Sequence, residues 1–312
     1  MRFILISAII LVGAALAVVF VLIPAENEVS LVPPEPTASL ASPAPEVLPE
    51  PEEEKPPATA EILNSKIQTG ETLIVELSEE PVNVIFDGKE VSAFPYRESF
   101  RAVIPFALGT KTGIHNFSAE FTDSPSIQKT IAIIAKVQQI IVFPPPPELG
   151  MTDKQIVQNL SVSNTDLRKI VAEVEEITRF AEPFVLPVGE EFVVSSPFGE
   201  IRKTGEEEIV HLGVDFDVPK GTAVHAINDG TVKNAYLDSI YGNSVIVDHG
   251  RGIYSLYLHL DSMSVKSGDT IEKGETLGFA GSSGLSSAPH LHLSVKINGV
   301  SVDPIQFIEA FR

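Results

Sequence analysis

The chain contains no cysteine, and this absence excludes several kinds of chemistry at once. Without cysteine there are no disulfides, no thiolate metal sites and no cysteine nucleophile. Any metal must therefore be held by histidine, aspartate or glutamate. The absence does not indicate a compartment, because a cysteine-free chain suits both oxidising and reducing surroundings.

Positive charge is also scarce. The chain has 22 Lys and Arg against 42 Asp and Glu, which gives a formal net charge of -20. A nucleic-acid partner is not expected, because its phosphates would be repelled rather than bound. We expect instead the solvated acidic surface of an exported protein. The 312 residues, 44% of them hydrophobic, are enough for about two packed domains.

The first segment carries a run of 21 residues without a charge, from Phe3 to Ile23. A helix of this length spans a hydrocarbon core of about 30 Å, so residues 1–24 are predicted to form a transmembrane helix. The run is longer than the apolar core of a cleavable signal, and no small-x-small site follows it. This favours an uncleaved signal anchor over a removed signal. Arg2 precedes the run and Glu26 follows it, which predicts a single-pass protein of the cytoplasmic (inner) membrane with its bulk on the extracytoplasmic side.

Two segments of different composition follow. Residues 25–60 are rich in proline and glutamate, cannot bury a core, and are predicted to be a disordered, semi-rigid linker; a proline-recognition ligand is a weaker alternative. Residues 61–140 contain short strand-like runs, and Asp87-Gly88 is a strong hairpin turn. This pattern predicts a small, immunoglobulin-like β-sandwich. His115, the one histidine of this region, is interpreted as a bystander.

The next segment, 141–184, combines a stiff break with a helix. Pro144–Pro147 interrupt the chain, and Thr152 can cap a helix that runs to about Phe180, with an interruption near Ser163-Asn164. We interpret this segment as a helical linker. The remaining segment, 185–312, has many short strands and glycine-rich turns, which predict a compact antiparallel β-structure.

Six of the seven histidines lie between residues 211 and 292. The first pattern is His211-Leu-Gly-Val-Asp215. In an extended strand the two Cα atoms would lie about 13 Å apart, which is too far for comfortable shared ligation of one metal ion. A bend is therefore needed, and Gly213 lies between them to allow it.

The other histidine patterns lie on predicted strands. His290 and His292 alternate with two leucines, so both imidazoles face one side and the leucines face a core. His259, in Tyr-Leu-His-Leu, lies on another strand. A catalytic zinc has three protein ligands and one position for water. His211, Asp215 and His292 would supply the three ligands, which leaves the remaining two histidines for proton transfer and oxyanion stabilisation.

The segment from about Ser196 to Pro304 resembles the lysostaphin-type, LytM-like zinc metallopeptidases, a family of peptidoglycan DD-metalloendopeptidases. The resemblance rests on the H-x-x-x-D, Y-x-H-L and H-x-H patterns quoted above and on the surrounding phrases, which are Ser196-Pro-Phe-Gly199, Gly213-Val-Asp-Phe216, Pro219-Lys-Gly-Thr222, Asp229-Gly-Thr-Val232, Gly242-Asn-Ser-Val245, Asp248-His-Gly250 and Gly278-Phe-Ala-Gly-Ser-Ser-Gly284. It covers about a third of the chain.

The resemblance implies a site and a fold. One Zn²⁺ per catalytic domain would be held by His211, Asp215 and His292, and His259 and His290 would be catalytic. The fold implied for 185–312 is an antiparallel β barrel-sandwich, the duplicated hybrid motif, within a chain that is mainly β.

Other residues of this region match the family less closely. Asn243 lies in the region that borders the family's substrate groove. His225 and His249 match no ligand position and are interpreted as bystanders. The acidic run 206–208 replaces a more usual arginine-rich lead-in, for which Arg202 is the nearest match, so the resemblance does not specify groove charge or substrate preference, whereas the zinc site is unaffected.

The function implied is a membrane-anchored zinc metalloendopeptidase that hydrolyses peptide cross-links or stem peptides of bacterial peptidoglycan. All five site residues are present, which favours an active enzyme over a catalytically silent factor that binds peptidoglycan or activates an amidase. A lipoyl-like carrier domain over Ser264–Ser282 is a weaker alternative, because no lysine-presenting hairpin is evident. The sequence does not indicate whether Gly-Gly or D-Ala-diaminopimelate bonds are cut, nor any protein partner or oligomeric state.

Overall fold

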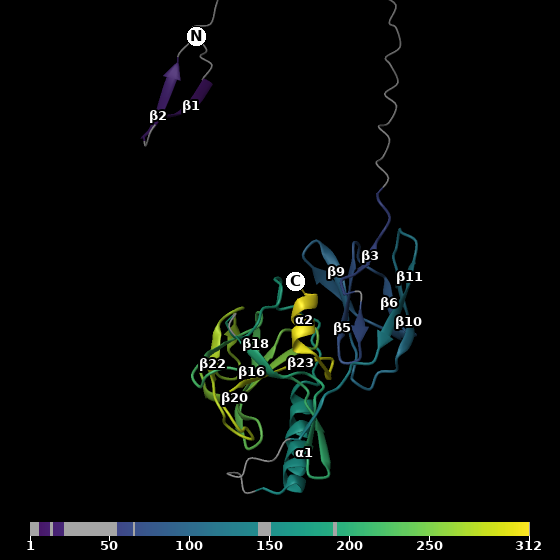
Figure 1. Ribbon diagram of the computed structural model, residues 1–312. Helices are drawn as coiled ribbons and strands as arrows, with labels where there is room; N and C mark the ends of the chain where they lie inside the picture. The colour runs from purple at the N-terminus through teal and green to yellow at the C-terminus, as the bar shows by residue number, and fades with distance from the viewer. Residues whose placement is uncertain are drawn as a thin grey trace, which may run out of the picture. The chain divides into compact units, whose positions relative to one another are not determined.

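The computed structural model describes residues 6–12, 15–21, 55–64, 66–142, 151–189 and 192–311 and is mainly β, which confirms the predicted class (Figure 1). The chain divides into two compact units, residues 1–54 and 55–312. Most of the predicted linker and the Pro144–Pro147 break lie outside the described residues.

The first unit contains two strands, β1 (Ile6–Val12) and β2 (Ala15–Val21), paired antiparallel. This corrects the predicted helix over 1–24. Both halves are rich in isoleucine and valine, whose branched side chains favour strands over helices, and Gly13 separates them in the sequence. No helix within the described parts of the chain is long and apolar enough to cross a bilayer.

Residues 60–134 form two sheets that share one core. The first sheet has the order β3 (Ala60–Ile62), β5 (Thr72–Leu77), β9 (Ser99–Pro105) and β8 (Ala93–Tyr96); the second has β4 (Ile67–Gln68), β11 (Ile127–Ile134), β10 (Gly113–Glu120), β6 (Asn83–Phe86) and β7 (Lys89–Glu90). Leu73 and Val75 of the first sheet pack with Phe117 and Ile131 of the second. The predicted hairpin at Asp87-Gly88 is confirmed, with φ of 48° and 74°.

Helix α1 (Asp153–Ile170) begins with a capping box between Thr152 and Gln155. It runs through the predicted interruption without a break. Ser163 Oγ donates to Asp238 Oδ2 at 2.9 Å, and Asn164 Oδ1 accepts from Tyr241 at 2.8 Å. Because these side chains bond to Asp238 at the end of β18 and to Tyr241 just before β19, rather than to their own backbone, they do not compete with the helix. The predicted helix end near residue 180 is also wrong, since α1 ends ten residues earlier.

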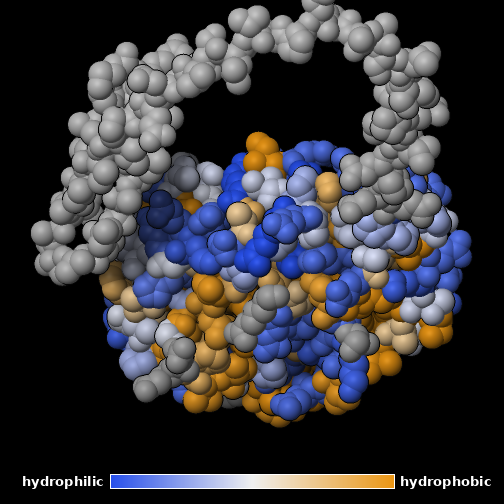
Figure 2. Space-filling model, turned by 90° about the horizontal axis from the view of Figure 1, so that it is seen from above, coloured by the Kyte–Doolittle hydropathy of each residue, from blue (hydrophilic) through white to orange (hydrophobic). Residues whose placement is uncertain are grey.

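The C-terminal part is built on one ten-stranded sheet. Its main order is β13 (Val193–Ser196), β16 (Val214–Asp217), β23 (Leu291–Ile297), β20 (Ile253–Met263), β19 (Gly242–Asp248), β18 (Gly230–Asp238) and β21 (Thr270–Ile271), with β17 (Ala223–His225), β22 (Thr276–Ala280) and β24 (Val300–Val302) at its margins. A smaller sheet has the order β12 (Ile140–Val142), β14 (Ile201–Thr204) and β15 (Glu207–Val210). Helix α2 (Pro304–Ala310) closes the chain. Hydrophilic and hydrophobic residues are interspersed over the face seen in Figure 2.

The side chains of strand β23 point alternately to the two sides of the sheet. Leu291 and Leu293 are fully buried in the main core, so His292 faces the other side of the sheet. His292 pairs with Leu258 of β20, which belongs to a second cluster that includes Leu167 of α1. Helix α1 therefore covers the sheet face that also carries His292.

Candidate metal centre

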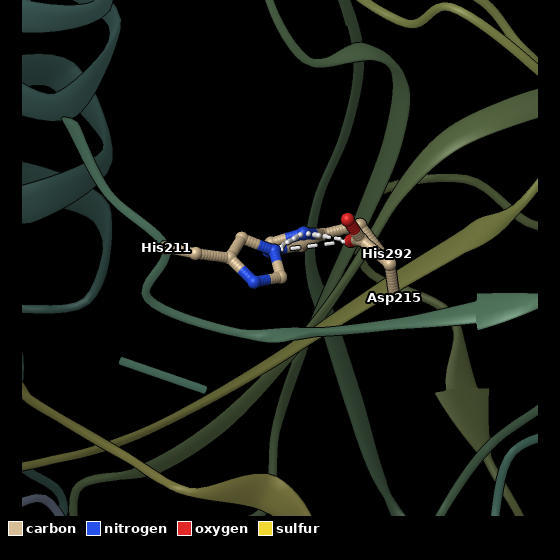
Figure 3. Close-up of side chains that lie close together, drawn as sticks. All are labelled: His211, Asp215 and His292. Atoms are coloured by element: carbon tan, nitrogen blue, oxygen red, sulfur yellow. Dashed lines mark hydrogen bonds and ion pairs between the residues drawn. The ribbon is translucent and has the colours of Figure 1, made fainter. Parts of the chain in front are cut away.

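Three side chains, two from paired strands and one from the segment just before the first of them, meet at one point (Figure 3). Asp215 lies on β16 opposite His292 on β23, and His211 lies just before β16. The Nε2 atom of His211 is 3.1 Å from Asp215 Oδ1 and 2.9 Å from His292 Nδ1, and His292 Nδ1 is 2.7 Å from Asp215 Oδ1. His211 and Asp215 are buried, and the His292 side chain is 12% exposed.

Gly213 permits this convergence in two ways. The backbone bends there, immediately before β16, so His211 does not continue the strand direction of Asp215. A Cβ atom at residue 213 would also lie 2.3 Å from His292 Nε2 and 2.6 Å from the Leu293 carbonyl oxygen. Any larger residue would therefore displace His292, which gives a steric reason for glycine beyond backbone freedom.

In His211 and His292, the ring nitrogen that points away from the centre forms a hydrogen bond with a neighbouring group. This bond determines which nitrogen carries the hydrogen and which has a lone pair directed at the centre. His211 Nδ1 lies 3.1 Å from the carbonyl oxygen of Pro197, which can only accept, so Nδ1 carries the hydrogen. His292 Nε2 lies 2.9 Å from Ser294 Oγ, whose own hydrogen is donated to the Leu212 carbonyl at 2.8 Å. Nε2 of His292 is therefore the donor. Two imidazole lone pairs and a carboxylate oxygen consequently face one another, an arrangement suited to holding a metal cation.

Arg202 binds Oδ2 of Asp215, the carboxylate oxygen that does not contact the two histidines. Its Nη2 donates to Asp215 Oδ2 at 2.5 Å, and its Nε donates to Glu200 at 3.2 Å. Burial raises the pKa of Asp215, but its contacts with His211 and His292 lower it by more, so the pKa lies well below its ordinary value. The sequence analysis identified Arg202 only as the nearest match to an arginine-rich lead-in, and its contact with Asp215 was not predicted.

His259 and His290 lie beside the three ligands. Their ring centroids are 4.9 Å apart, and His290 Nε2 is 3.8 Å from Asp215 Oδ1. His259 Nδ1 donates to the Ser283 carbonyl and His290 Nδ1 to the Ala288 carbonyl, both at 2.8 Å. The Nε2 lone pair of each ring is therefore free to accept a proton. Burial lowers the pKa of His259 to about 3, so this imidazole is neutral.

The backbone at His259 adopts a left-handed conformation, with φ of 62°. For a residue with a side chain this costs about 1–3 kcal/mol and is concentrated at functional sites. Asn243 supports the same region: its side-chain amide donates to the carbonyls of Leu260 and Asp261 at 3.1 and 3.0 Å. Its backbone N–H donates to Ser283 Oγ at 2.9 Å. Asn243 thus positions the loop that orients His259, and its role in a substrate groove stays a prediction.

The remaining histidines lie apart from this centre. His249 is fully buried, and its ring contacts the Asp229 carbonyl at 2.6 Å and Ser255 Oγ at 2.8 Å. Burial lowers its pKa to about 4, which suits a neutral structural residue. His225 lies on β17 near Thr276. Neither belongs to the group of three candidate ligands.

A cavity of about 420 Å³ adjoins the centre. His211, His259 and His292 line one side of it, and helix α1 lines another through residues from Ile156 to Arg168. Further lining residues come from β15 and from the outer part of β23. The metal centre therefore opens into a space that the predicted linker helix bounds.

Comparisons with known proteins agree with this geometry. Residues 209–304 match the model of peptidase family M23, which confirms the predicted family for this part of the chain. An uncharacterised metalloprotease of Haemophilus influenzae is 43% identical over 123 residues, 38% of this chain and 26% of that protein. The DD-carboxypeptidase/endopeptidase Mpg of Neisseria meningitidis is 39% identical over 113 residues, 36% of this chain and 26% of that protein.

The likeness to a solved structure extends further along the chain. A crystal structure described as a peptidase M23 from Pseudomonas aeruginosa has a TM-score of 0.58 and 27% identity over 80% of this chain and 97% of that chain. By contrast, the matched region spans about a quarter of the length of the two curated relatives above. The shared architecture therefore includes residues outside the family match.

Proposed function

We propose, from the match of residues 209–304 to peptidase family M23 and from the metal centre they contain, that this chain is a zinc metalloendopeptidase acting on peptide bonds of bacterial peptidoglycan. One observation carries the proposal. Two imidazole lone pairs and an ionised carboxylate converge beside two further histidines whose Nδ1 atoms contact backbone carbonyls, which leaves Nε2 of each ring for proton transfer. The relatives named as DD-endopeptidases support peptidoglycan as the substrate.

The three ligand groups fit zinc. Two ligands bound at about 2.1 Å to a tetrahedral zinc lie about 3.4 Å apart. The three contacts between the His211, Asp215 and His292 ligand atoms measure 2.7 to 3.1 Å, close to that separation. Two nitrogens and one oxygen also form a donor set that zinc prefers, and each ligand is oriented by a second protein group.

The protein's own residues then have separate tasks. When bound, zinc would polarise the scissile carbonyl and lower the pKa of a water molecule. Because burial disfavours the charged form of His259, we assign this ring to orienting the water through its Nε2 lone pair. His290 is more exposed, with 17% of its side chain accessible, and its Nε2 accepts the water proton. The same nitrogen then returns that proton to the leaving amine.

Three finer features belong to the same proposal. The run from Phe3 to Ile23 carries no charge, and burial of its apolar side chains supports anchoring of the chain to the cell membrane, with the metal centre on the extracytoplasmic side. The two sheets with one core support an immunoglobulin-like sandwich for residues 61–140. The ten-stranded sheet supports a barrel-sandwich for residues 185–312.

The test measures zinc and hydrolysis in the same samples of the full chain. Wild-type protein should bind one zinc and release new amino termini from purified peptidoglycan, and a chelator should abolish the release. Asp215→Asn should lose both zinc and activity. His290→Ala should keep zinc and lose about 10²- to 10⁴-fold in rate, the contribution of a general base.

His225→Ala serves as the matched control, because this histidine lies outside the centre and should change neither quantity. Stoichiometric zinc without any released amino termini would instead favour the catalytically silent factor. Full activity of Asp215→Asn with no zinc bound would defeat the metal assignment.

A further inference from the structure

Lys296 lies along the same strand as the metal ligand His292. Residues of β23 alternate between the two sides of the sheet, so His292, Ser294 and Lys296 share one face. All three line the cavity beside the metal centre. Four residues of extended strand place the Cα atom of Lys296 about 13 Å from that of His292. The cavity therefore has a metal centre near one end and a lysine farther along.

The ammonium group of Lys296 is buried without a carboxylate. The residue is 7% exposed, and its Nζ donates to Ser301 Oγ at 2.6 Å. Within residues 55–311, as far as they are described, no acidic side chain forms an ion pair with it. Burial lowers its pKa to about 8, with a further contribution from Arg168. A buried charge that lacks a counter-ion is costly and therefore marks a candidate binding site.

The other charged groups of the cavity leave this end positive. Arg168, on the last turn of α1, lines the same cavity and has no ion pair with a described acidic residue. Glu208 is the acidic lining residue, and it pairs with Lys203 at 3.0 Å. Arg202 is engaged by Asp215 and Glu200. Two cations from different elements are thus left for an anion that enters the cavity.

We propose that Lys296, with Arg168 beside it, binds a free carboxylate of the peptide substrate. This inference rests on the proposed function and specifies its substrate class. The span of about 13 Å corresponds to three or four residues of extended peptide between the carboxylate and the bond that is cut. Leu212 and Leu258 also line this cavity, which suits small apolar side chains. The enzyme would thereby select peptidoglycan peptides that still carry an unamidated carboxyl group.

The test compares one cross-linked peptide dimer in two forms, with its carboxyl groups free or converted to amides. The wild-type full chain with zinc should cleave the free form with a kcat/KM at least about tenfold higher, as expected for a hydrogen bond to a charged group. Lys296→Met should lower kcat/KM for the free form to the level of the amide, mainly through KM. Lys296→Arg should restore part of the preference, and Arg168→Ala should weaken it.

Lys169→Ala is the matched control, because this neighbouring lysine is exposed, pairs with Asp166 and does not line the cavity. It should leave the preference unchanged. A Lys296→Met protein that folds and retains the wild-type preference overturns the proposal. Folding is checked by thermal melting, since replacing a buried charge with a well-packed apolar side chain is often neutral or stabilising.

A failure of the proposed function is distinguishable from a failure of this inference. If the wild type cleaves neither dimer, the peptidase assignment fails, and binding of both dimers to metal-depleted protein is measured by calorimetry. Tighter binding of the free form that Lys296→Met abolishes would still support the carboxylate site. Equal binding of the two forms to wild-type protein would overturn it.

Discussion

Each of the four histidines around the metal centre is held through one ring nitrogen, and the holding group determines which nitrogen remains for chemistry. In three cases this group is a backbone carbonyl, which substitution cannot remove. In the fourth case it is a side chain, because His292 Nε2 donates to Ser294 Oγ. The tautomer of one metal ligand therefore depends on a single replaceable hydroxyl.

Replacing this hydroxyl should weaken metal binding without changing the ligands. Ser294→Ala removes the acceptor for His292 Nε2, so the ring loses its fixed orientation. We expect zinc affinity to fall about 10- to 100-fold, the usual effect of losing such a supporting group. Competition with a chromogenic chelator measures the affinity directly, whether or not the protein is active.

Ser286→Ala provides the comparison for this variant. Ser286 Oγ lies 3.3 Å from His290 Nδ1, whose shorter contact is with the Ala288 carbonyl at 2.8 Å. Its loss should leave zinc affinity unchanged. Equal zinc affinities for wild type and Ser294→Ala would show that the hydroxyl does not set the tautomer.

At the scale of elements, helix α1 bounds the cavity into which the metal centre opens. It contributes Leu167 to the cluster that contains Leu256 and Leu258 of β20, and it bounds the cavity of the metal centre. Only two of its 18 residues are buried, so little apolar area holds it in place. We therefore expect α1 to move when a branched peptide cross-link enters this cavity.

Because the chain has no cysteine, one introduced pair can test this movement without competing thiols. Ser163 on α1 and Asp238 on β18 are in direct contact, with 2.9 Å between their side-chain oxygens. We expect the double variant Ser163→Cys, Asp238→Cys to form a disulfide on oxidation. The oxidised protein should cleave cross-linked peptidoglycan more slowly, and a reductant should restore the rate.

Each single-cysteine variant, treated with the same oxidant, controls for other effects of oxidation. Mass spectrometry establishes that the disulfide has formed. A fully cross-linked double variant that hydrolyses the wall at the wild-type rate would show that α1 does not need to move.

The position of α1 also shows what the sequence could and could not predict. Its start at Thr152 was predictable, because a capping box is local. The placement of His290 and His292 on the side of Asp215 was predictable for the same reason, because alternation along a strand is local. The docking of α1 onto β20 was not, since Leu256 and Leu258 lie far along the chain and carry no local sign of a helical partner. Likewise, Arg202 reaches Asp215 only through the fold.

At the scale of the whole molecule, the two β regions of residues 55–312 share a core. Ile74 and Tyr96 of the N-terminal sheets belong to the same buried cluster as Phe184 and Phe311 of the C-terminal part. Polar contacts join the same surfaces: Gln306 exchanges hydrogen bonds with the backbone of Thr72 at 2.8 and 3.0 Å. A shared core of this kind should make the two regions unfold together.

Phe311 tests this coupling because it lies at the junction. It is fully buried, and its ring lies 6.0 Å from Tyr96 and 5.0 Å from Phe184, measured between centroids. Phe311→Ala should lower the free energy of unfolding by about 3–5 kcal/mol, the usual cost of truncating a buried phenylalanine. Phe279→Ala, a substitution of the same kind at a residue that is 38% exposed, should cost far less.

In calorimetry, residues 55–312 should give one transition, and Phe311→Ala should shift it as a whole. Two separate transitions, of which Phe311→Ala shifts only the one at higher temperature, would show instead that the two β regions unfold independently.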